Sequence, residues 1–220
     1  MWKGLLIFTL LTAPSLVSQE KKQMAADCAI QISLTAPIEV QKEFIPSGWM
    51  GDGASERAKE YIQMAQVANP KPRPGAQNNV VTKFTYKPGA VGFAGIYWQW
   101  PVNNWGDKPA KVVKGASLVS FWAAGEKGGE IVEFKAGGMA GKPCGDSFEV
   151  SLGAIALTKD WKRYTILLRS RSDPRRPIYG AFAWVANRDS NHEGVTFYLD
   201  DIRYEASRAP IGHPKHHPKE

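Results

Sequence analysis

The segment Phe93-Ala-Gly-Ile-Tyr-Trp-Gln-Trp-Pro-Val-Asn-Asn-Trp-Gly106 is the most informative stretch of this chain. Its first half alternates large side chains with a period of two, which is typical of a β-strand. Its second half is a polar loop that begins at a proline and ends in Trp105. Such a strand and loop predict either a core packed with aromatic rings or a surface that stacks flat rings, as sugars do.

Alternation divides the rings of this strand between two faces. Ile96, Trp98 and Trp100 share one face with alanine, which predicts packing in a core. Tyr97 and Gln99 share the other face, and the glutamine indicates a wetter surface. Tyr97 and Gln99 are therefore candidate ligand contacts, whereas the tryptophans of the first face favour the core.

Short apolar runs continue on both sides of this strand. With 21 glycines and 15 prolines in 220 residues, the composition favours a turn-rich β protein over a helical one. The spacing of the runs predicts an all-β sandwich or jelly roll. Residues 54–67 fit either a helix or a strand, and the prolines of residues 70–74 indicate an extended loop. The expected strands span residues 28–34, 80–86, 93–100, 116–123, 130–135, 161–168, 178–185 and 195–204.

One domain is expected between two terminal segments. Residues 1–18 have the pattern of a signal peptide, in which Lys3 precedes an apolar run that is too short and interrupted to span a membrane. Residues 206–220 are rich in proline, histidine and basic residues and are expected to be a disordered tail. The β-sandwich domain then covers residues 19–205, in a protein that is expected to be secreted or periplasmic.

The net charge limits the expected binding partners, and the cysteine content permits one disulfide. The net charge is +7 without an arginine-rich stripe, and export makes nucleic acid an unexpected partner. Export also permits a disulfide between Cys28 and Cys144, which would constrain the unfolded chain by roughly 4 kcal/mol. The alternative is two unrelated free thiols, and nothing in the sequence decides between the two.

The run Thr196-Phe-Tyr-Leu-Asp-Asp-Ile-Arg-Tyr204 resembles the last strand of the galactose-binding-like jelly rolls, which include many carbohydrate-binding modules. The resemblance spans residues 39–205 and implies a jelly-roll β-sandwich whose partner is a polysaccharide or a cell-surface glycan. Three upstream segments are similar to strands of that family in the same order: residues 121–130, 161–166 and 180–184.

The same resemblance implies a structural calcium near the end of the last strand. Asp200 or Asp201 would be a ligand, with Glu39 or Glu43 contributing from an N-terminal strand; calcium prefers six to eight oxygen ligands. Alternation places Asp201 on the apolar face, with Leu199, where an unpaired carboxylate is unfavourable. The alternative is that Asp201 pairs with an arginine or with backbone N–H groups.

Two tryptophan-containing segments form the candidate glycan-binding surface. Trp105 follows two asparagines, whose amides can satisfy sugar hydroxyls while the indole stacks on the ring. The segment Pro46-Ser-Gly-Trp-Met-Gly-Asp-Gly53 reads as a second loop, with Trp49 and Asp52 as one wall of a cleft. The alternative is that these tryptophans plug the end of a sandwich. The candidate ligand-binding residues are Trp49, Asp52, Tyr97, Gln99, Asn103, Asn104 and Trp105.

Three functions remain open from the sequence. The leading hypothesis is an exported, non-catalytic glycan-binding domain. The alternatives are a structural or assembly domain of the cell envelope and a glycan-active hydrolase or lyase. Glu130 and Glu133 are three apart on an expected strand and so point to opposite faces, where they cannot flank one glycosidic bond.

Overall fold

A computed structural model describes residues 28–55, 57–69, 71–139, 144–146, 148–168 and 177–206. The predicted signal segment and the tail beyond residue 206 lie outside these ranges. None of the helices within them is long and apolar enough to cross a lipid bilayer.

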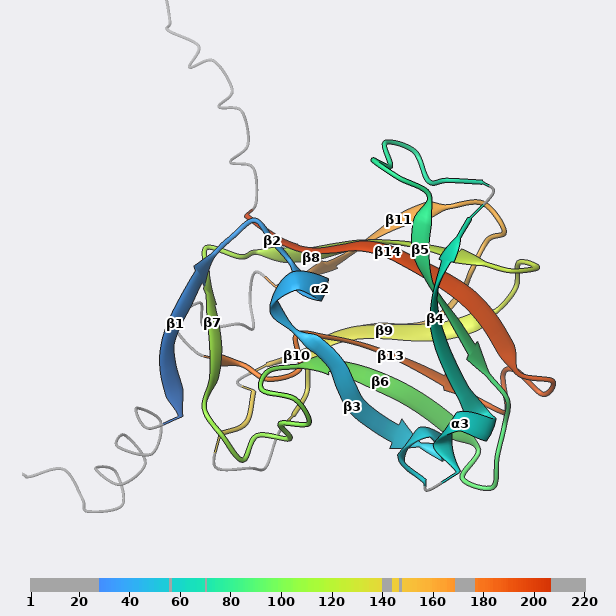
Figure 1. The fold of residues 1–220 in the computed structure, drawn as a ribbon, viewed down its shortest axis with the longest axis horizontal. Coiled ribbons are helices and arrows are strands. Elements are labelled where there is room, and N and C mark those ends of the chain that lie inside the picture. The colour runs from blue at the N-terminus through green and yellow to red at the C-terminus, as the bar shows by residue number, and fades with distance from the viewer. Residues whose placement is uncertain are drawn as a thin grey trace, which may run out of the picture.

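Two antiparallel sheets face each other as a sandwich (Figure 1). The first sheet runs in the order β10 (Glu149–Ala156), β9 (Ile131–Gly137), β13 (Phe182–Asn187), β6 (Phe93–Gln99) and β3 (Ile45–Gly51). The second runs in the order β11 (Lys162–Leu167), β8 (Leu118–Gly125), β14 (Val195–Glu205), β5 (Val80–Tyr86) and β4 (Ile62–Ala68), and β2 (Ile38–Glu39) pairs with β14. Strands β3 and β4 are therefore edge strands.

The order of eight strands defines the fold. When β5, β6, β8, β9, β10, β11, β13 and β14 are counted along the chain, one sheet reads 1-8-3-6 and the other 2-7-4-5. This is the strand order of a jelly roll, in which each step along the chain changes sheets except for the hairpin in the middle. The prediction of an all-β jelly-roll sandwich is confirmed.

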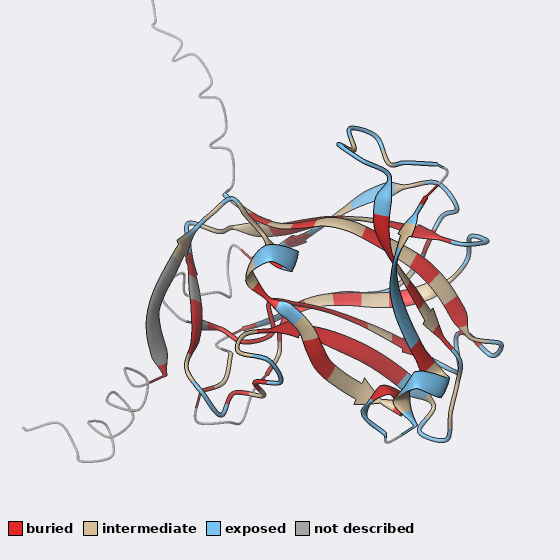
Figure 2. Cartoon of the chain, in the orientation of Figure 1, coloured by how far each residue is buried: buried red, intermediate tan, exposed pale blue. Residues whose placement is uncertain are grey.

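Aromatic side chains fill the space between the two sheets, where Figure 2 shows the inner strands as mostly buried. Phe84 of β5 stacks on Phe197 of β14 with ring centroids 5.3 Å apart, and Trp98 and Trp184 of the opposite sheet meet it edge-on. The predicted core position of Trp98 is confirmed, since only 2% of it is exposed. Trp100 is partly buried against the same core.

A third, small sheet lies at one end of the sandwich (Figure 1). It contains β1 (Ala29–Thr35), β7 (Ala110–Lys114) and β12 (Pro177–Ile178), and β1 pairs with β7 in parallel. The disulfide between Cys28 and Cys144 lies in a second apolar cluster on this side, together with Tyr97. The face expected to be wetter is therefore buried: Tyr97 is 4% exposed and Gln99 is fully buried.

The remaining differences from the expected strands lie near the edges of the sheets. Residues 54–67 were expected to form either a helix or a strand, and they contain both. Helix α3 (Ala58–Tyr61) leads directly into β4. The segment expected to be a loop at residues 46–53 is mostly strand β3, followed by a short 3-10 helix η1 (Asp52–Ala54). Helix α2 (Val40–Glu43) and strands β7 and β10 were not expected.

Asp146 ties the disulfide-bearing segment to the start of β13. Its carboxylate accepts hydrogen bonds from the backbone N–H groups of Tyr179 at 2.8 Å, Gly180 at 3.0 Å and Met139 at 3.1 Å. Burial raises the pKa of Asp146 to about 6, although these three hydrogen bonds act in the opposite direction.

We expect the free energy of unfolding to depend on Asp146 between about pH 4 and pH 6. The pKa of an unfolded aspartate is about 3.9. Because the folded pKa is higher, the contribution is fully present below about pH 3.9 and is lost as the pH rises through about 6. Urea titrations from pH 3.5 to 7.5 should show this decline in the wild type and not in Asp146→Asn. An identical pH profile for both proteins would contradict the assignment.

Candidate ligand-binding site

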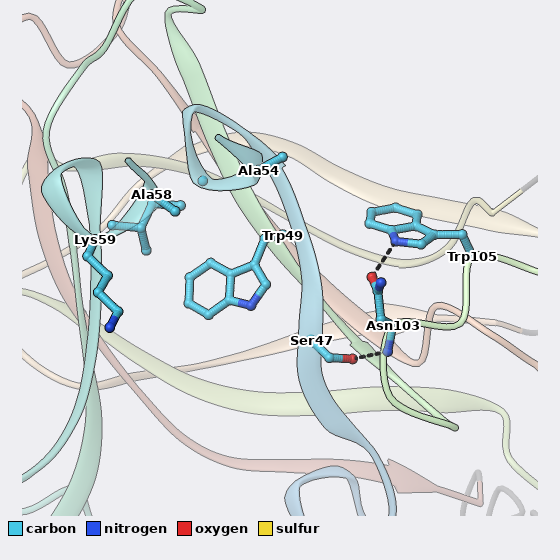
Figure 3. A pocket seen from close by; sticks show the side chains of 9 residues that line it. Ser47, Trp49, Ala54, Ala58, Lys59, Asn103 and Trp105 are labelled. Atoms are coloured by element: carbon cyan, nitrogen blue, oxygen red, sulfur yellow. Dashed lines mark hydrogen bonds between the residues drawn. The ribbon is translucent and has the colours of Figure 1, made fainter. Parts of the chain in front are cut away.

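A pocket of about 520 Å³ lies along the free edge of β3 (Figure 3). Its volume falls within the range of roughly 300–1,000 Å³ that is usual for small-molecule sites. Most of the lining is apolar, with a few polar side chains. The lining residues are Ser47, Trp49, Gly53, Ala54, Ala58, Lys59, Ile62, Asn103 and Trp105.

Trp49 reaches the pocket from β3 itself. In the antiparallel pairing of β3 with β6, Trp49 lies opposite Ile96, so its ring is on the side of the sheet that faces the core. Since β3 is an edge strand, the ring is only partly covered and borders the pocket. In Figure 3 Trp49 lies on one side of the β3 ribbon and Trp105 on the other.

Trp105 is held by contacts at its edge. Its indole Nε1 donates to Asn103 Oδ1 at 2.7 Å, and its ring meets Tyr97 edge-to-face with centroids 6.1 Å apart. The Asn103 backbone N–H donates in turn to Ser47 Oγ at 2.9 Å. Asn103 has a φ of 55°, a left-handed conformation that asparagine tolerates better than most residues.

A buried polar chain supports this arrangement from below. Ser47 Oγ donates to Gln99 Oε1 at 3.2 Å, so Gln99 fixes the hydroxyl that receives Asn103. Gly48 is required beside it, because a Cβ there would lie 2.5 Å from Gln99 Nε2. Tyr97 and Gln99 therefore position the pocket residues from beneath and do not line the pocket themselves.

Asn104 shapes the loop that carries Trp105. It is 2% exposed, and its Oδ1 accepts from the backbone N–H groups of Gly106, Asp107 and Lys108 at 3.1–3.2 Å. Its Nδ2 donates to the carbonyls of Trp100 and Lys108. Both polar atoms of its side chain are used within the protein, so Asn104 is a scaffold for Trp105.

Asp52 is also inside the structure, at 2% exposure. Its carboxylate accepts hydrogen bonds from Tyr86 Oη and from the backbone N–H groups of Gly89 and Val91, each at 2.9 Å, and from Gly92 N–H at 3.3 Å. Burial alone would raise the pKa of Asp52, but the four hydrogen bonds together hold it below the usual value. Asp52 anchors the loop before β6 and does not line the pocket.

The structure thus brings three of the sequence candidates into one pocket: Trp49, Asn103 and Trp105. Sequence reasoning missed Ser47 and Lys59. Ser47 lies within a quoted candidate segment, but its role depends on a bulge between Pro46 and Gly48 that no local pattern announces. Lys59 lies on α3, in the segment that fitted two secondary structures, and it is the one charged side chain among the described lining residues.

Asp200 and Asp201 lie at a bulge in β14, where the pairing with β8 shifts register. Asp201 has a φ of 52°, and the bulge turns both carboxylates away from the core. Ile202 and Tyr204 are fully buried in the core instead of the two aspartates. The expectation that Asp201 shares the apolar face is therefore wrong, because alternation does not continue through a bulge.

These carboxylates are paired with guanidinium groups. Arg73 Nε contacts Asp200 at 2.6 Å and Arg73 Nη2 contacts Asp201 at 3.2 Å. Arg203 contacts Asp201 and, at 3.1 Å, Glu39. Two cations thus pair with three carboxylates, and within the described residues no group of three or more acidic, histidine or cysteine side chains is arranged to hold a metal. The guanidinium groups contact the carboxylates that the resemblance assigns to calcium, and calcium binding stays a prediction of that resemblance.

No protein-family model matches this chain, and no curated protein matches it. The structure is similar to the family 11 carbohydrate-binding module of cellulosomal cellulase Lic26A-Cel5E of Clostridium thermocellum, at 12% identity and a TM-score of 0.45 over 80% of this chain and 96% of that one. It is also similar to the family 30 module of cellulase Cel9D-Cel44B of the same organism, at 13% identity and a TM-score of 0.41 over 68% and 92%. A third similar structure is TmCBM61 with β-1,4-galactotriose, at 18% identity and a TM-score of 0.39 over 77% and 94%.

The jelly-roll class of this chain rests on its own strand order.

Proposed function

We propose that this chain is an exported, non-catalytic glycan-binding domain and that the pocket along β3 holds the sugar. The observation that carries the proposal is the convergence of two partly buried tryptophan rings, Trp49 and Trp105, on one pocket. Indole faces bind the C–H faces of pyranose rings, and exposed indoles outside a core are otherwise unfavourable.

Polar groups at the pocket suit the hydroxyls of a sugar. The amide Nδ2 of Asn103 is not used in the hydrogen bond to Trp105, which involves Oδ1. The free edge of β3 adds backbone donors and acceptors that have no partner strand within the described residues. Rings for stacking and amides for hydroxyls are the combination that a sugar requires.

The support beneath Trp105 favours a binding site over a plug in the core. The chain of contacts from Gln99 through Ser47 and Asn103 fixes the indole while leaving it only partly buried. Holding a side chain in its bound geometry before the ligand arrives reduces the entropy lost on binding.

The lining also supports binding without catalysis. Hydrolysis of a glycosidic bond usually needs two carboxyl groups that flank it. None of the nine described residues around the pocket is aspartate, glutamate or histidine. Lys59 is the one charged side chain among these nine residues.

Trp105→Ala and Trp49→Ala should each weaken glycan binding by about 30-fold, which corresponds to about 2 kcal/mol for a stacked aromatic contact. Affinity electrophoresis against gels that contain soluble β-glucans, galactans, xylans or uronate polymers measures the effect. Phe93→Ala is the matched control, because Phe93 is an aromatic residue that is 38% exposed and lies outside the pocket.

Retention of the wild type by none of these polymers would contradict the proposal and favour an assembly domain of the envelope. Equal retention of all three variants would show that the glycan binds elsewhere on the protein.

A further inference from the structure

A second hollow, of about 210 Å³, lies on the outer face of the other sheet. It shares no lining residue with the pocket along β3. Strands β8 and β14 provide its floor, and the segment before β11 provides one wall. The lining residues are Asn69, Lys71, Ala124, Gly125, Glu126, Lys159, Trp161 and Tyr198.

The strand register explains why this hollow exists. Tyr198 pairs with Ala124, and it faces outward because its neighbours Phe197 and Leu199 face the core. Lys162 pairs with Ala123, so the preceding residue, Trp161, comes beside Ala124 from the other side. Across the sheet, Ala124 therefore lies between the aromatic residues Trp161 and Tyr198.

The small side chain of Ala124 lies beneath the two rings, and all three residues line the hollow. The centroids of Trp161 and Tyr198 are 6.4 Å apart and their planes are inclined by 58°. Both rings are partly buried, and Ala124 at 3% exposure forms the floor. We refer to Ala124, Trp161 and Tyr198 as the aromatic notch.

Hydrogen bonds at their edges hold both rings in place. Trp161 Nε1 donates to the carbonyl of Lys71 at 2.8 Å. Tyr198 Oη donates to Glu126 Oε1 at 3.2 Å, and Lys83 Nζ donates to the same oxygen at 2.9 Å. The polar atoms of the rings are thereby satisfied, so the ring faces are what the notch offers to a ligand.

Two charged side chains beside the notch, Glu126 and Lys159, line the same hollow. Glu126 Oε2 accepts no hydrogen bond within the described residues, whereas Oε1 accepts two. Lys159 also lines the hollow, and its ammonium group is a hydrogen-bond donor. An acceptor, a donor and two rings match the groups of a pyranose, which has hydroxyls at its edge and C–H groups on its faces.

We propose that the aromatic notch binds a single pyranose ring, so that the protein has two glycan sites on two different sheets. This inference rests on the proposed function for the class of ligand. The volume limits the ligand to one ring, because 210 Å³ is below the roughly 300–1,000 Å³ of sites for larger molecules. Two sites on one rigid domain would engage a polymer together and bind it more tightly than either site alone.

Calorimetric titration with the soluble oligosaccharide of whichever polymer retains the wild type tests the notch. The wild type should bind two molecules per chain. Ala124→Leu fills the notch from an outward position and should bind one, as should Trp161→Ala, which removes one wall. The double variant Trp49→Ala/Trp105→Ala should also bind one. Melting temperatures and circular dichroism confirm that each variant is folded.

Retention on the immobilised polymer supplies a second measurement. Loss of either site should reduce apparent affinity by roughly 100-fold, since simultaneous engagement of two sites is lost. Trp161→Ala serves here if Ala124→Leu does not fold.

The two proposals fail in different ways. One molecule bound per wild-type chain, lost in Trp105→Ala and unchanged in Ala124→Leu and Trp161→Ala, overturns the notch and leaves the pocket along β3 in place. The reverse pattern overturns that pocket and supports the notch. Absence of binding to any glycan in the panel overturns both.

Discussion

Removal of the disulfide between Cys28 and Cys144 should lower the free energy of unfolding by about 4–5 kcal/mol. The two cysteines are 116 residues apart, so the bond closes a long loop in the unfolded chain and restricts its entropy. Since domains are usually stable by 5–15 kcal/mol, the loss would leave Cys28→Ala/Cys144→Ala close to unfolding at ambient temperature.

The same change should weaken glycan binding at the pocket along β3. Cys144 N–H donates to the carbonyl of Gly106 at 3.0 Å, and Gly106 directly follows Trp105. The ring of Tyr97, which supports Trp105, lies in the same apolar cluster as both cysteines. A looser cluster would let Trp105 leave its position in the pocket, so the double variant should lose affinity as well as stability.

Urea unfolding followed by circular dichroism measures the stability of this variant. Wild-type protein treated with excess dithiothreitol should unfold at the same urea concentration as the double variant, and the reductant should not change the double variant itself. If oxidised wild type and double variant share one midpoint, the bond does not stabilise the folded state.

Asp52→Asn should lower the free energy of unfolding by about 3 kcal/mol. Asp52 is 2% exposed, and both its oxygens accept, from Tyr86 Oη and from three backbone N–H groups. An asparagine has the same shape but places an NH₂ group opposite donors, which leaves buried N–H groups without acceptors and removes charge-assisted hydrogen bonds.

The pH dependence of Asp52 has the opposite sign to that of Asp146. The folded pKa of Asp52 lies below the unfolded value of about 3.9. Its contribution is therefore present above about pH 3.9 and is lost as the pH falls through the folded pKa. Asp52→Asn should lack this acid-induced loss.

Asp160→Asn is the matched control, because Asp160 is exposed and pairs with Lys71 at the surface. It should leave the urea midpoint nearly unchanged, because solvent screens an exposed ion pair. Equal urea midpoints for Asp52→Asn and the wild type at pH 7 would contradict the role of Asp52 as a buried anchor.

Alternation predicted the central strands well, because a strand inside a sandwich must place every second side chain in the core. The expected strand at residues 80–86 coincides with β5, and the ends of β6, β11 and β14 differ from expectation by one residue. The pattern was weakest at the edges. Strand β3 contains Pro46, Gly48 and Gly51, which read as a turn, yet an edge strand with a bulge tolerates them.

The disulfide and the carboxylates of β14 show what long-range contacts add. The local sequence around Cys28 and Cys144 does not indicate whether they form a disulfide. Their distance depends on how the segments around them fold against β6. Pairing of Asp201 with an arginine was one of two open alternatives, and the structure supplies Arg73 from the loop before β5 and Arg203 from β14.

The sequence by itself determined the class of fold and the identity of the rings available for binding. Both follow from local chemistry, namely alternation along strands and the placement of glycine, proline and asparagine in turns. Only the tertiary structure decided which rings a ligand can reach. Tyr97 and Trp105 come from one continuous segment, but Tyr97 is buried inside the disulfide cluster, whereas Trp105 packs against that cluster and still borders the pocket that Trp49 also lines. Exposure depends on what packs over a residue, and those neighbours are distant in the chain.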